Sequence, residues 1–497
     1  MLEQIFLVTY FVLLIILSVF GLHRYLMVYL FYKYKKKTIE PQETFSKLPE
    51  ITVQLPIFNE MYVIERLIEA VCNFDYPREL LEIQVLDDST DETCKVAADC
   101  VQKYKDLGYR IDYIHRNNRE GYKAGALENG LKLSKGEFIV IFDADFVPQP
   151  DMLKKTIHFF TDKKIGMVQV RWGHINRDYS FLTKVQSIFL DGHLMMEQTA
   201  RFRSGRYFNF NGTAGVWRKD CIISSGGWQH DTLTEDLDLS YRAQMIGWEF
   251  IFLKDVIAPA EIPVEMNSFK SQQHRWTKGS IQTAKKLLPR ISKTKMPLKV
   301  KLEALIHMTN NFAYLLMAIL SVVMFPALLL QYSITDMDKL WIRIISVDIP
   351  IFTAASLSVL LFYMCSQHEA YGNWLKHIIY IPFIMALGVG ISINNAKAVL
   401  EALLNYKTEF TRTPKYQIEN SEDNTWTNKK YAGNKTLVYI IEFVFGLYFT
   451  VNLAIAIYLK LYGVAPFLLI YLLGFYYISF MSIFQRSLWL KKIFKFK

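Results

Sequence analysis

Four clusters of polar side chains along the chain combine residue types that can bind and transfer a charged substrate. They are Asp87-Asp88, Asp143-x-Asp145, Glu235-Asp236 and Gln272-x-x-Arg275-Trp276. Carboxylates can coordinate a divalent cation, bind a ribose hydroxyl or accept a proton. An arginine can neutralise a phosphate, and an indole ring can stack on a sugar. Together the clusters indicate an enzyme that takes a sugar from a sugar nucleotide.

The pair Asp143 and Asp145 follows directly on the apolar run at 138–142. Two carboxylates with one spacer residue can hold Mg²⁺ or Mn²⁺ together with diphosphate oxygens. The alternative is a solvated loop. The position after a buried strand favours the metal site.

Asp87 and Asp88 follow another apolar run. Adjacent carboxylates at this point can accept hydrogen bonds from a base N–H and a ribose hydroxyl. The alternative is helix capping, because Ser89 or Asp91 could cap the helix that comes next. We expect capping by Ser89 or Asp91 and nucleotide contact by Asp87 and Asp88.

The sequence Thr234-Glu235-Asp236 precedes a helical stretch. The alternative is that Thr234 simply caps this helix. The functional interpretation makes Asp236 and its neighbour Glu235 the catalytic carboxylates. Asp236 is then the general base that removes the proton from the attacking hydroxyl. One direct attack at the anomeric carbon inverts its configuration.

Gln272, Arg275 and Trp276 fall on about one helical turn. Arg275 can bind the leaving diphosphate and Trp276 can stack on the acceptor sugar. A helix on the membrane surface is the alternative, but it explains the arginine and the tryptophan and not Gln272. Lys123, in Gly-Tyr-Lys-Ala-Gly, can reach a phosphate near a helix N-terminus.

Short β-branched runs alternate with helical stretches, a pattern typical of a parallel α/β sheet. Ligands of such sheets lie beyond the carboxyl ends of the strands, so Asp87 and Asp143 should share one rim. The fully apolar run at 138–142 predicts a central strand. We expect strands at 51–55, 83–86, 111–114 and 138–142, and helices at 62–72, 92–105 and 123–133.

The composition indicates a protein that lies partly in lipid. Hydrophobic residues make up 52% of the chain, and the net charge is +10. The chain has no basic stripe interleaved with aromatics and no zinc-finger or RNA-binding signature, which argues against nucleic acid as a partner. Basic residues instead crowd beside hydrophobic segments, as at 33–37. The five cysteines show no CxxC spacing, which predicts free thiols and no structural zinc.

Hydrophobic segments flank the predicted catalytic part. The segment at 378–393 is short of the roughly 20 residues that a span needs, and an amphipathic stretch follows it. We therefore expect it to be interfacial or re-entrant, which leaves five spans and puts the catalytic domain and the basic tail on the cytoplasmic side. We expect a multi-pass protein, most simply of a bacterial cell membrane. The segments are 5–32, 304–330, 347–364, 378–393, 437–459 and 464–481.

As a set, the motifs resemble glycosyltransferase family 2, and above all its processive membrane β-glycan synthases of the cellulose-synthase and cellulose-synthase-like kind, such as mannan and glucomannan synthases. The resemblance covers nearly all of 51–279. It rests on QVLDDST at 84–90, GYKAGAL at 121–127, FDADF at 142–146, FNGTAGVWR at 210–218 and QHRW at 273–276. It implies an α/β GT-A domain inserted between transmembrane helices, a UDP- or GDP-sugar donor, a divalent cation (Mg²⁺ or Mn²⁺) and inversion. It assigns nucleotide contact to Asp87 and Asp88, the metal to Asp145 with Asp143 nearby, acceptor contact to Asn211, Gly212 and Trp276, and the base to Asp236.

A second resemblance lies at 410–415, which is similar to the Phe-x-Val-Thr-x-Lys gating loop of cellulose synthases. Phe410, Thr413 and Lys415 keep the pattern, Arg412 stands in place of the valine, and Pro414 lies within the pattern. The expected organisation is a membrane helix at 1–32, the catalytic domain at 40–297, two spans at 298–364, an interfacial helix with the gating segment at 375–435, two spans at 436–484 and a basic tail at 485–497.

The leading interpretation is a membrane-bound inverting hexosyltransferase. It would add glucose from UDP-glucose, or mannose from GDP-mannose, to a growing β-linked polysaccharide, with room for partner proteins in export. Asn310, Asn311 and Asn452 would line a path for that chain, although interhelical hydrogen bonding is an alternative. The first rival is a transferase that adds one sugar to a lipid. The second is an inactive channel or scaffold, against which the intact acidic clusters argue.

Overall fold

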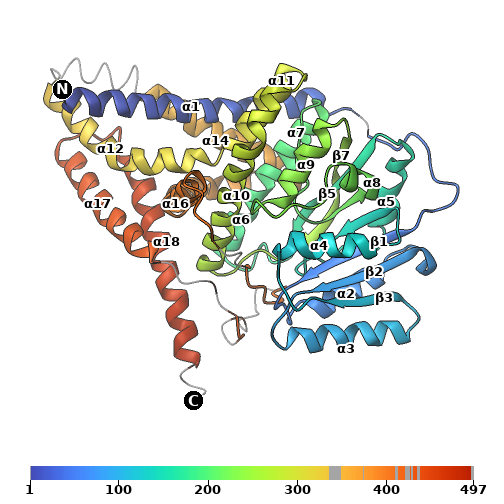
Figure 1. The fold of residues 1–497 in the computed structure, drawn as a ribbon. Coiled ribbons are helices and arrows are strands. Elements are labelled where there is room, and N and C mark those ends of the chain that lie inside the picture. The colour runs from blue at the N-terminus through green and yellow to red at the C-terminus, as the bar shows by residue number, and fades with distance from the viewer. Residues whose placement is uncertain are drawn as a thin grey trace.

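The computed structural model describes residues 2–37, 39–334, 349–372, 374–408, 412–419, 426, 429–431, 433 and 437–493. They form an α/β part and a group of long apolar helices, which lie on opposite sides of the molecule in Figure 1. Helix α1 (Leu2–Tyr34) runs along both parts.

The α/β part is built on one sheet of seven strands in the order β3-β2-β1-β4-β6-β5-β7. Neighbours from β3 to β4 are parallel, as are β5 and β7, whereas β6 is antiparallel to both β4 and β5. The strands are β1 (Ile51–Ile57), β2 (Leu81–Asp87), β3 (Arg110–His115), β4 (Phe138–Ile141), β5 (Ile165–His174), β6 (Gly215–Arg218) and β7 (Glu249–Ala260).

The four predicted strands are confirmed as β1 to β4, and β4 is central and fully buried. The three predicted helices are confirmed as α2, α3 and α4 with slightly shifted ends. The helices of this part are α2 (Ile64–Cys72), η1 (Arg78–Leu80), α3 (Thr93–Asp106), α4 (Tyr122–Leu133), α5 (Met152–Ile157), η2 (His158–Thr161), α6 (Phe181–Asp191), the π-helical turn η3 (Gly192–Glu197), α7 (Gln198–Arg203), α8 (Lys219–Ser224), α9 (Glu235–Met245) and α10 (Met266–Lys293).

The strand order explains where a ligand can bind. The chain leaves β1 toward β2 on one side, while β4 lies on the other side of β1. Such a reversal opens a crevice beyond the carboxyl ends of the strands. Apolar cores cover both faces of the sheet, so the strand ends are held rigidly at this rim.

The apolar helices follow α10 along the chain, except for α1. Among the described residues, three helices are long and apolar enough to cross a membrane: Ile5–Tyr34, Val438–Tyr458 and Ala465–Gln485. Two bent pairs, α11 with α12 at 55° and η5–α15 with α16 at 42°, bring the number to five if each pair is one span. The further elements are α11 (Leu298–Thr309), α12 (Phe312–Ile334), α14 (Ile349–Tyr371), η5 (Trp374–Tyr380), α15 (Ile381–Gly390), α16 (Ser392–Leu403), α17 (Val438–Tyr458) and α18 (Ala465–Ile493).

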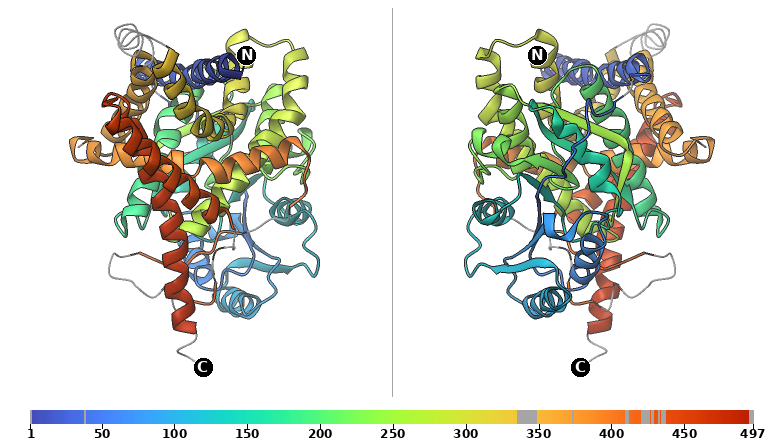
Figure 2. Two further views of the ribbon diagram at one scale, coloured as in Figure 1. Left: turned by 90° about the vertical axis from the view of Figure 1, so that its left-hand side faces the viewer. Right: turned by 90° about the vertical axis from the view of Figure 1, so that its right-hand side faces the viewer.

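The predicted non-spanning segment at 378–393 falls on the second bent pair. The bend between α15 and α16 suits a broken span or a re-entrant helix, so its course remains a prediction. One apolar core joins α1, α6, η3, α14 and α18, and ties the membrane helices to the α/β part. In both views of Figure 2, α18 descends from the membrane helices beside the sheet.

Candidate active site

A cavity of about 180 Å³ lies beyond the carboxyl ends of β1, β2 and β4. Almost all of the site residues predicted from the sequence line it. Phe410 lies outside the described residues, and Asp87 is the one described residue of the set that does not line the cavity. The lining includes Asp88, Lys123, Asp143, Asp145, Asn211, Gly212, Glu235, Asp236, Gln272, Arg275, Trp276, Arg412, Thr413 and Lys415.

Asp88 is held by an arginine that the sequence analysis missed. Arg116 donates from Nε to Asp88 Oδ1 at 2.7 Å and from Nη2 to Oδ2 at 2.5 Å. Such a bidentate pair fixes the orientation of the carboxylate. Arg116 directly follows β3, so its place after a strand on the same rim was the signal that could have found it.

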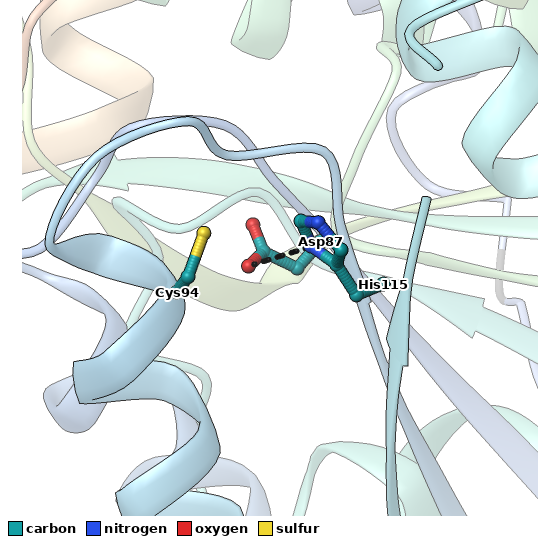
Figure 3. Close-up of side chains that lie close together, drawn as sticks. All are labelled: Asp87, Cys94 and His115. Atoms are coloured by element: carbon teal, nitrogen blue, oxygen red, sulfur yellow. Dashed lines mark ion pairs between the residues drawn. The ribbon is translucent and has the colours of Figure 1, made fainter. Parts of the chain in front are cut away.

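Asp87 does not line the cavity but supports its rim through hydrogen bonds. Its Oδ1 accepts a hydrogen bond from the Ser89 N–H at 2.9 Å, and its Oδ2 accepts one from the Tyr113 hydroxyl at 2.6 Å. Figure 3 shows Cys94 and His115 close to the same carboxylate. One ligand-type atom from each of Asp87, Cys94 and His115 lies within 4.8 Å of the other two. Burial raises the pKa of the Cys94 thiol, which donates to the Ser89 carbonyl at 3.1 Å. The group thus forms a hydrogen-bonded support, and nucleotide contact by Asp87 remains a prediction.

The capping alternatives have different outcomes. Asp91 accepts from the N–H of Thr93, the first residue of α3, at 2.9 Å, but the N-cap position is Glu92, whose side chain makes no capping hydrogen bond. Ser89 instead accepts from the Asn59 N–H at 2.7 Å. Thr234 precedes α9 but makes no capping hydrogen bond with its side chain, so capping does not explain the cluster at 234–236.

Lys123 connects the acidic pair to the predicted acceptor loop. Its Nζ contacts the Asp143 carboxylate and donates to the Gly212 carbonyl at 2.9 Å. Burial lowers the pKa of Lys123, but Asp143 and Glu235 outweigh it and raise the pKa, so the side chain is a cation. Gly212 has a φ of +82°, and a Cβ there would lie 3.0 Å from Asp236 Oδ2, so the glycine lets this loop approach the Asp236 carboxylate.

Asp145 pairs with a cation from the C-terminal half of the chain. Lys415 Nζ contacts the Asp145 carboxylate and donates to the Glu261 carbonyl at 2.7 Å. The Glu261 carboxylate accepts from the backbone N–H groups of the two residues that follow Lys415, each at 2.9 Å. The segment predicted to be a gating loop is therefore anchored on the carboxylate predicted to hold the metal.

Asp236 is the second residue of α9 and lines the cavity. Burial and the neighbouring Glu235 carboxylate raise the pKa of Asp236 to about 7. Burial likewise raises the pKa of Glu235. A carboxyl group with a pKa near neutrality suits general base catalysis, because it is ionised yet basic enough to take a proton.

Helix α10 carries the block at 272–276. Gln272, Arg275 and Trp276 all line the cavity from this one helix, as the spacing predicted. Burial lowers the pKa of Arg275, and the Glu235 and Asp143 carboxylates oppose that shift. Arg275 therefore supplies a positive charge near the centre of an acidic site.

A second cavity of about 470 Å³ continues from the first one between the apolar helices. Side chains of α1, α12, α14, α15 and α18 line it, as do Asn310 and Asn311 at the end of α11. Asn452 is buried in α17, which packs on α18, and is not among the lining residues, which corrects the expectation for that residue. The two cavities share Trp172, Leu190, Asn211, Thr234, Asp236 and Trp276.

Comparisons with known proteins agree with this geometry. Residues 49–279 match the family described as Glycosyltransferase like family 2. Glucomannan 4-beta-mannosyltransferase 1 of Oryza sativa subsp. japonica is 41% identical over 279 residues, which are 55% of this chain and 53% of that protein. Glucomannan 4-beta-mannosyltransferase 2 of Arabidopsis thaliana is 41% identical over 290 residues, 57% of this chain and 54% of that protein. The chain thus spans about half the length of these relatives.

A solved mannosyltransferase from Pyrobaculum calidifontis, in complex with GDP-Man and Mn²⁺, is similar in structure, with a TM-score of 0.55 and 20% identity. The match covers 80% of this chain and 99% of that one. It confirms the expected fold class. Both sequence relatives are plant proteins, so the comparisons do not support the expectation of a bacterial membrane.

Proposed function

We propose that this chain, which belongs to glycosyltransferase family 2 through residues 49–279, is a membrane-bound inverting mannosyltransferase that extends a β-linked polysaccharide. The observation that carries the proposal is the meeting of the two cavities at Asp236 and Trp276. The smaller cavity suits a nucleotide sugar. The larger one suits a chain that is held while the nucleotide is exchanged.

The chemistry follows from the side chains around this junction. Asp236 takes the proton of the acceptor hydroxyl, whose oxygen then attacks the anomeric carbon of the donor sugar. The bond from that carbon to the diphosphate breaks, and its electron pair leaves with the nucleoside diphosphate. Lys123 and Arg275 bind the leaving group. Attack from the opposite face converts an α-linked donor into a β-linked product.

Asp143 and Asp145 would hold a divalent cation. Both carboxylates line the smaller cavity, and each contacts a lysine ammonium group in the structure, so the position attracts cations. Carboxylate oxygens are the ligands that Mg²⁺ and Mn²⁺ prefer. Such a cation neutralises charge on the donor diphosphate when it is bound.

The choice of sugar rests on the sequence relatives. Two proteins at 41% identity are named 4-beta-mannosyltransferases, which supports GDP-mannose as the donor and a β-1,4 linkage. UDP-glucose is the second candidate donor. The acceptor is the growing polysaccharide itself, and the long apolar helices support a location in a membrane.

The test is product analysis with the purified full chain in lipid nanodiscs, given Mn²⁺ and either GDP-mannose or UDP-glucose. We expect a polymer from GDP-mannose that an endo-β-1,4-mannanase digests. Asp236→Asn is the inactive control. A product limited to one sugar on a lipid would contradict this proposal and support a transferase with a lipid acceptor. An absence of transfer from either donor would favour an inactive scaffold.

A further inference from the structure

Three side chains of different chemical type meet at the ends of β2 and β3, beside the smaller cavity. Asp87 ends β2, His115 ends β3, and Cys94 is the second residue of α3. Among the residues that the structure describes, this is the one group of three such side chains that comes close enough to hold a metal ion. We call these three residues, drawn in Figure 3, the mixed-ligand group.

The fold holds this group together without a ligand. Asp87 and His115 are register partners in the parallel pair of β2 and β3, and His115 Nδ1 lies 3.6 Å from Asp87 Oδ2. The first turn of α3 brings Cys94 to the same place. The Asp87 side chain is fully buried, whereas the His115 side chain is 31% exposed. A cation can therefore reach the group from solvent past the imidazole ring.

The spacing of the three ligand atoms fits a tetrahedral zinc ion. Zn²⁺ binds nitrogen and oxygen at about 2.0–2.2 Å and sulfur at about 2.3 Å, so its ligand atoms lie about 3.3–3.6 Å from one another. The distance of 3.6 Å between Asp87 and His115 already agrees with this geometry. Cys94 Sγ lies within 4.8 Å of both, and a small rotation of its side chain would bring it into range. A water molecule can complete the tetrahedron.

Asp87 also has the supporting hydrogen bonds that metal-binding carboxylates usually have. Its Oδ1 accepts from the Ser89 N–H and its Oδ2 from the Tyr113 hydroxyl. Because a carboxylate oxygen has more than one lone pair, Oδ2 can keep the hydrogen bond from Tyr113 and bind a cation as well. The Tyr113 ring stacks on the His115 ring, which fixes the orientation of the imidazole. Such outer contacts orient the ligands and strengthen metal binding.

A larger cluster of charged side chains, between the apolar helices, lacks these properties. Arg201 Nη2 lies 3.1 Å from Glu197 Oε2, and Arg201 Nε donates to Glu303 Oε1 at 2.9 Å. Glu303 also contacts His23 Nε2 at 3.1 Å. Both carboxylates of that cluster are therefore neutralised by an arginine. Asp87 forms no ion pair with a lysine or arginine of the described residues, so its buried charge can still take up a cation.

The ligand types favour zinc over the cation of the acidic pair. Thiolate and imidazole are ligands that Zn²⁺ binds well, whereas Mg²⁺ and Mn²⁺ prefer oxygen, which is all that Asp143 and Asp145 offer. The thiol of Cys94 would lose its proton to solvent as the metal binds, because the thiolate is the metal ligand. The spacing of the cysteines gives no sign of this group, since its members come from two strands and a helix.

We propose that Asp87, Cys94 and His115 bind one Zn²⁺ ion, and that this ion inhibits the enzyme by opposing the binding of the donor nucleotide. The inhibition rests on the proposed function, because Asp87 is predicted to contact the nucleotide. Bound zinc would neutralise this carboxylate and occupy its oxygen, so that it can no longer accept a hydrogen bond from the base. The mixed-ligand group also adjoins Asp88, which lines the cavity.

The first measurement is zinc binding, which does not require activity. The full chain in nanodiscs is saturated with Mn²⁺, which fills the acidic pair, and Zn²⁺ is then titrated by calorimetry. We expect one Zn²⁺ per chain, and Co²⁺ in its place should give the charge-transfer absorption of a thiolate ligand. In Cys94→Ser and His115→Gln the affinity for Zn²⁺ should fall at least about tenfold, since even the loss of an outer contact commonly costs that much. The thiolate band should be absent from Cys94→Ser.

Cys100→Ser is the matched control, because it makes the same change on the same helix at a buried thiol outside the group. It should keep both the zinc affinity and the cobalt spectrum. Melting temperatures show whether each variant is folded, and His115→Gln changes a partly exposed side chain and serves if Cys94→Ser is not. Undiminished zinc binding in Cys94→Ser and His115→Gln would overturn the site, as would a wild type that binds no Zn²⁺ beside saturating Mn²⁺.

The second measurement is transfer from GDP-mannose at saturating Mn²⁺. Zinc should raise the KM for GDP-mannose several-fold in the wild type and in Cys100→Ser, and should leave the KM of Cys94→Ser unchanged. Equal inhibition of Cys94→Ser would show that zinc acts by replacing Mn²⁺ at the acidic pair, and would overturn the inhibitory role. Zinc that binds at the group without raising the KM would overturn it too. No transfer from either donor would overturn the proposed function, whereas the binding data would still decide the zinc site.

Discussion

The two cavities that meet at Asp236 are built in different ways. The smaller one is lined by charged groups at strand ends and helix starts, and its acidic pair contacts lysines in the structure. The larger one is lined by aliphatic, aromatic and polar side chains from helices spread over most of the chain. A charged, compact site suits a ligand that is exchanged in every cycle. A long wall of mixed polarity suits a ligand that remains bound and moves along the cavity.

The first expected effect separates Asp236, the predicted base, from the residues that bind the donor and the acceptor. Asp236→Asn keeps the size of the side chain and its hydrogen bond from the Leu237 N–H, but it cannot take a proton. We expect at least about a 10²-fold loss of transfer, with donor binding retained. Initial rates with radiolabelled GDP-mannose and calorimetry with GDP measure the two quantities, and near-normal turnover would remove Asp236 from the mechanism.

The next expected effect concerns only the smaller cavity, where the metal and the donor are predicted to bind. Asp145→Asn, or an excess of chelator, should abolish donor binding and transfer, and Mn²⁺ or Mg²⁺ should restore both only in the wild type. Binding of Mn²⁺ can be followed by electron paramagnetic resonance in the absence of donor. Full activity in chelator would mean that the pair of Asp143 and Asp145 has a structural role.

The pH dependence of the transfer rate should follow the ionisation of Asp236, which lines both cavities. The base works when it is ionised, and its pKa is about 7, so the rate should rise with pH and level off above about 7. Near pH 6 it should be about tenfold lower. The Asp236 carboxyl binds a proton more tightly in the folded state than in the unfolded chain. Protonation of Asp236 therefore stabilises the folded state at acid pH, and this contribution to the free energy of unfolding is lost as the pH rises through 7. Asp236→Asn should therefore raise the melting temperature at pH 8 more than at pH 5, and a pH-independent rate would contradict the assignment.

The smallest expected effect concerns Trp276, which lines both cavities. Trp276→Ala should raise the acceptor KM several-fold and shorten the polymer, because ring stacking contributes about 0.5–1.5 kcal/mol. Trp276→Phe is the matched control and should keep most of the chain length. Both variants should bind GDP normally. Equal chain lengths in the wild type and Trp276→Ala would show that the acceptor is held elsewhere.

The sequence predicted the smaller cavity far better than the larger one. Asp88, Asp143 and Asp236 lie next to strand ends or a helix start, and such local patterns can be read from a single chain. The pairing of Asp145 with Lys415 joins residues 270 positions apart and leaves no local pattern. The same is true of β6, whose four residues become a strand only by pairing antiparallel with β4 and β5. Arg201 and Glu197 gave no signal, because nothing in their spacing indicates that α1 and α11 close around them.

The contact between His23 and Glu303 has a consequence for biosynthesis. The chain is made from its N-terminus, so α1 is complete before Glu303, 280 positions after His23, is made. A polar side chain in an apolar helix is unfavourable in lipid without a partner. The arrival of α11 supplies the carboxylate, and with it His307, Asn310 and Asn311, which line the larger cavity. Assembly of the membrane part is thus coupled to completion of the catalytic part that lies between these two helices.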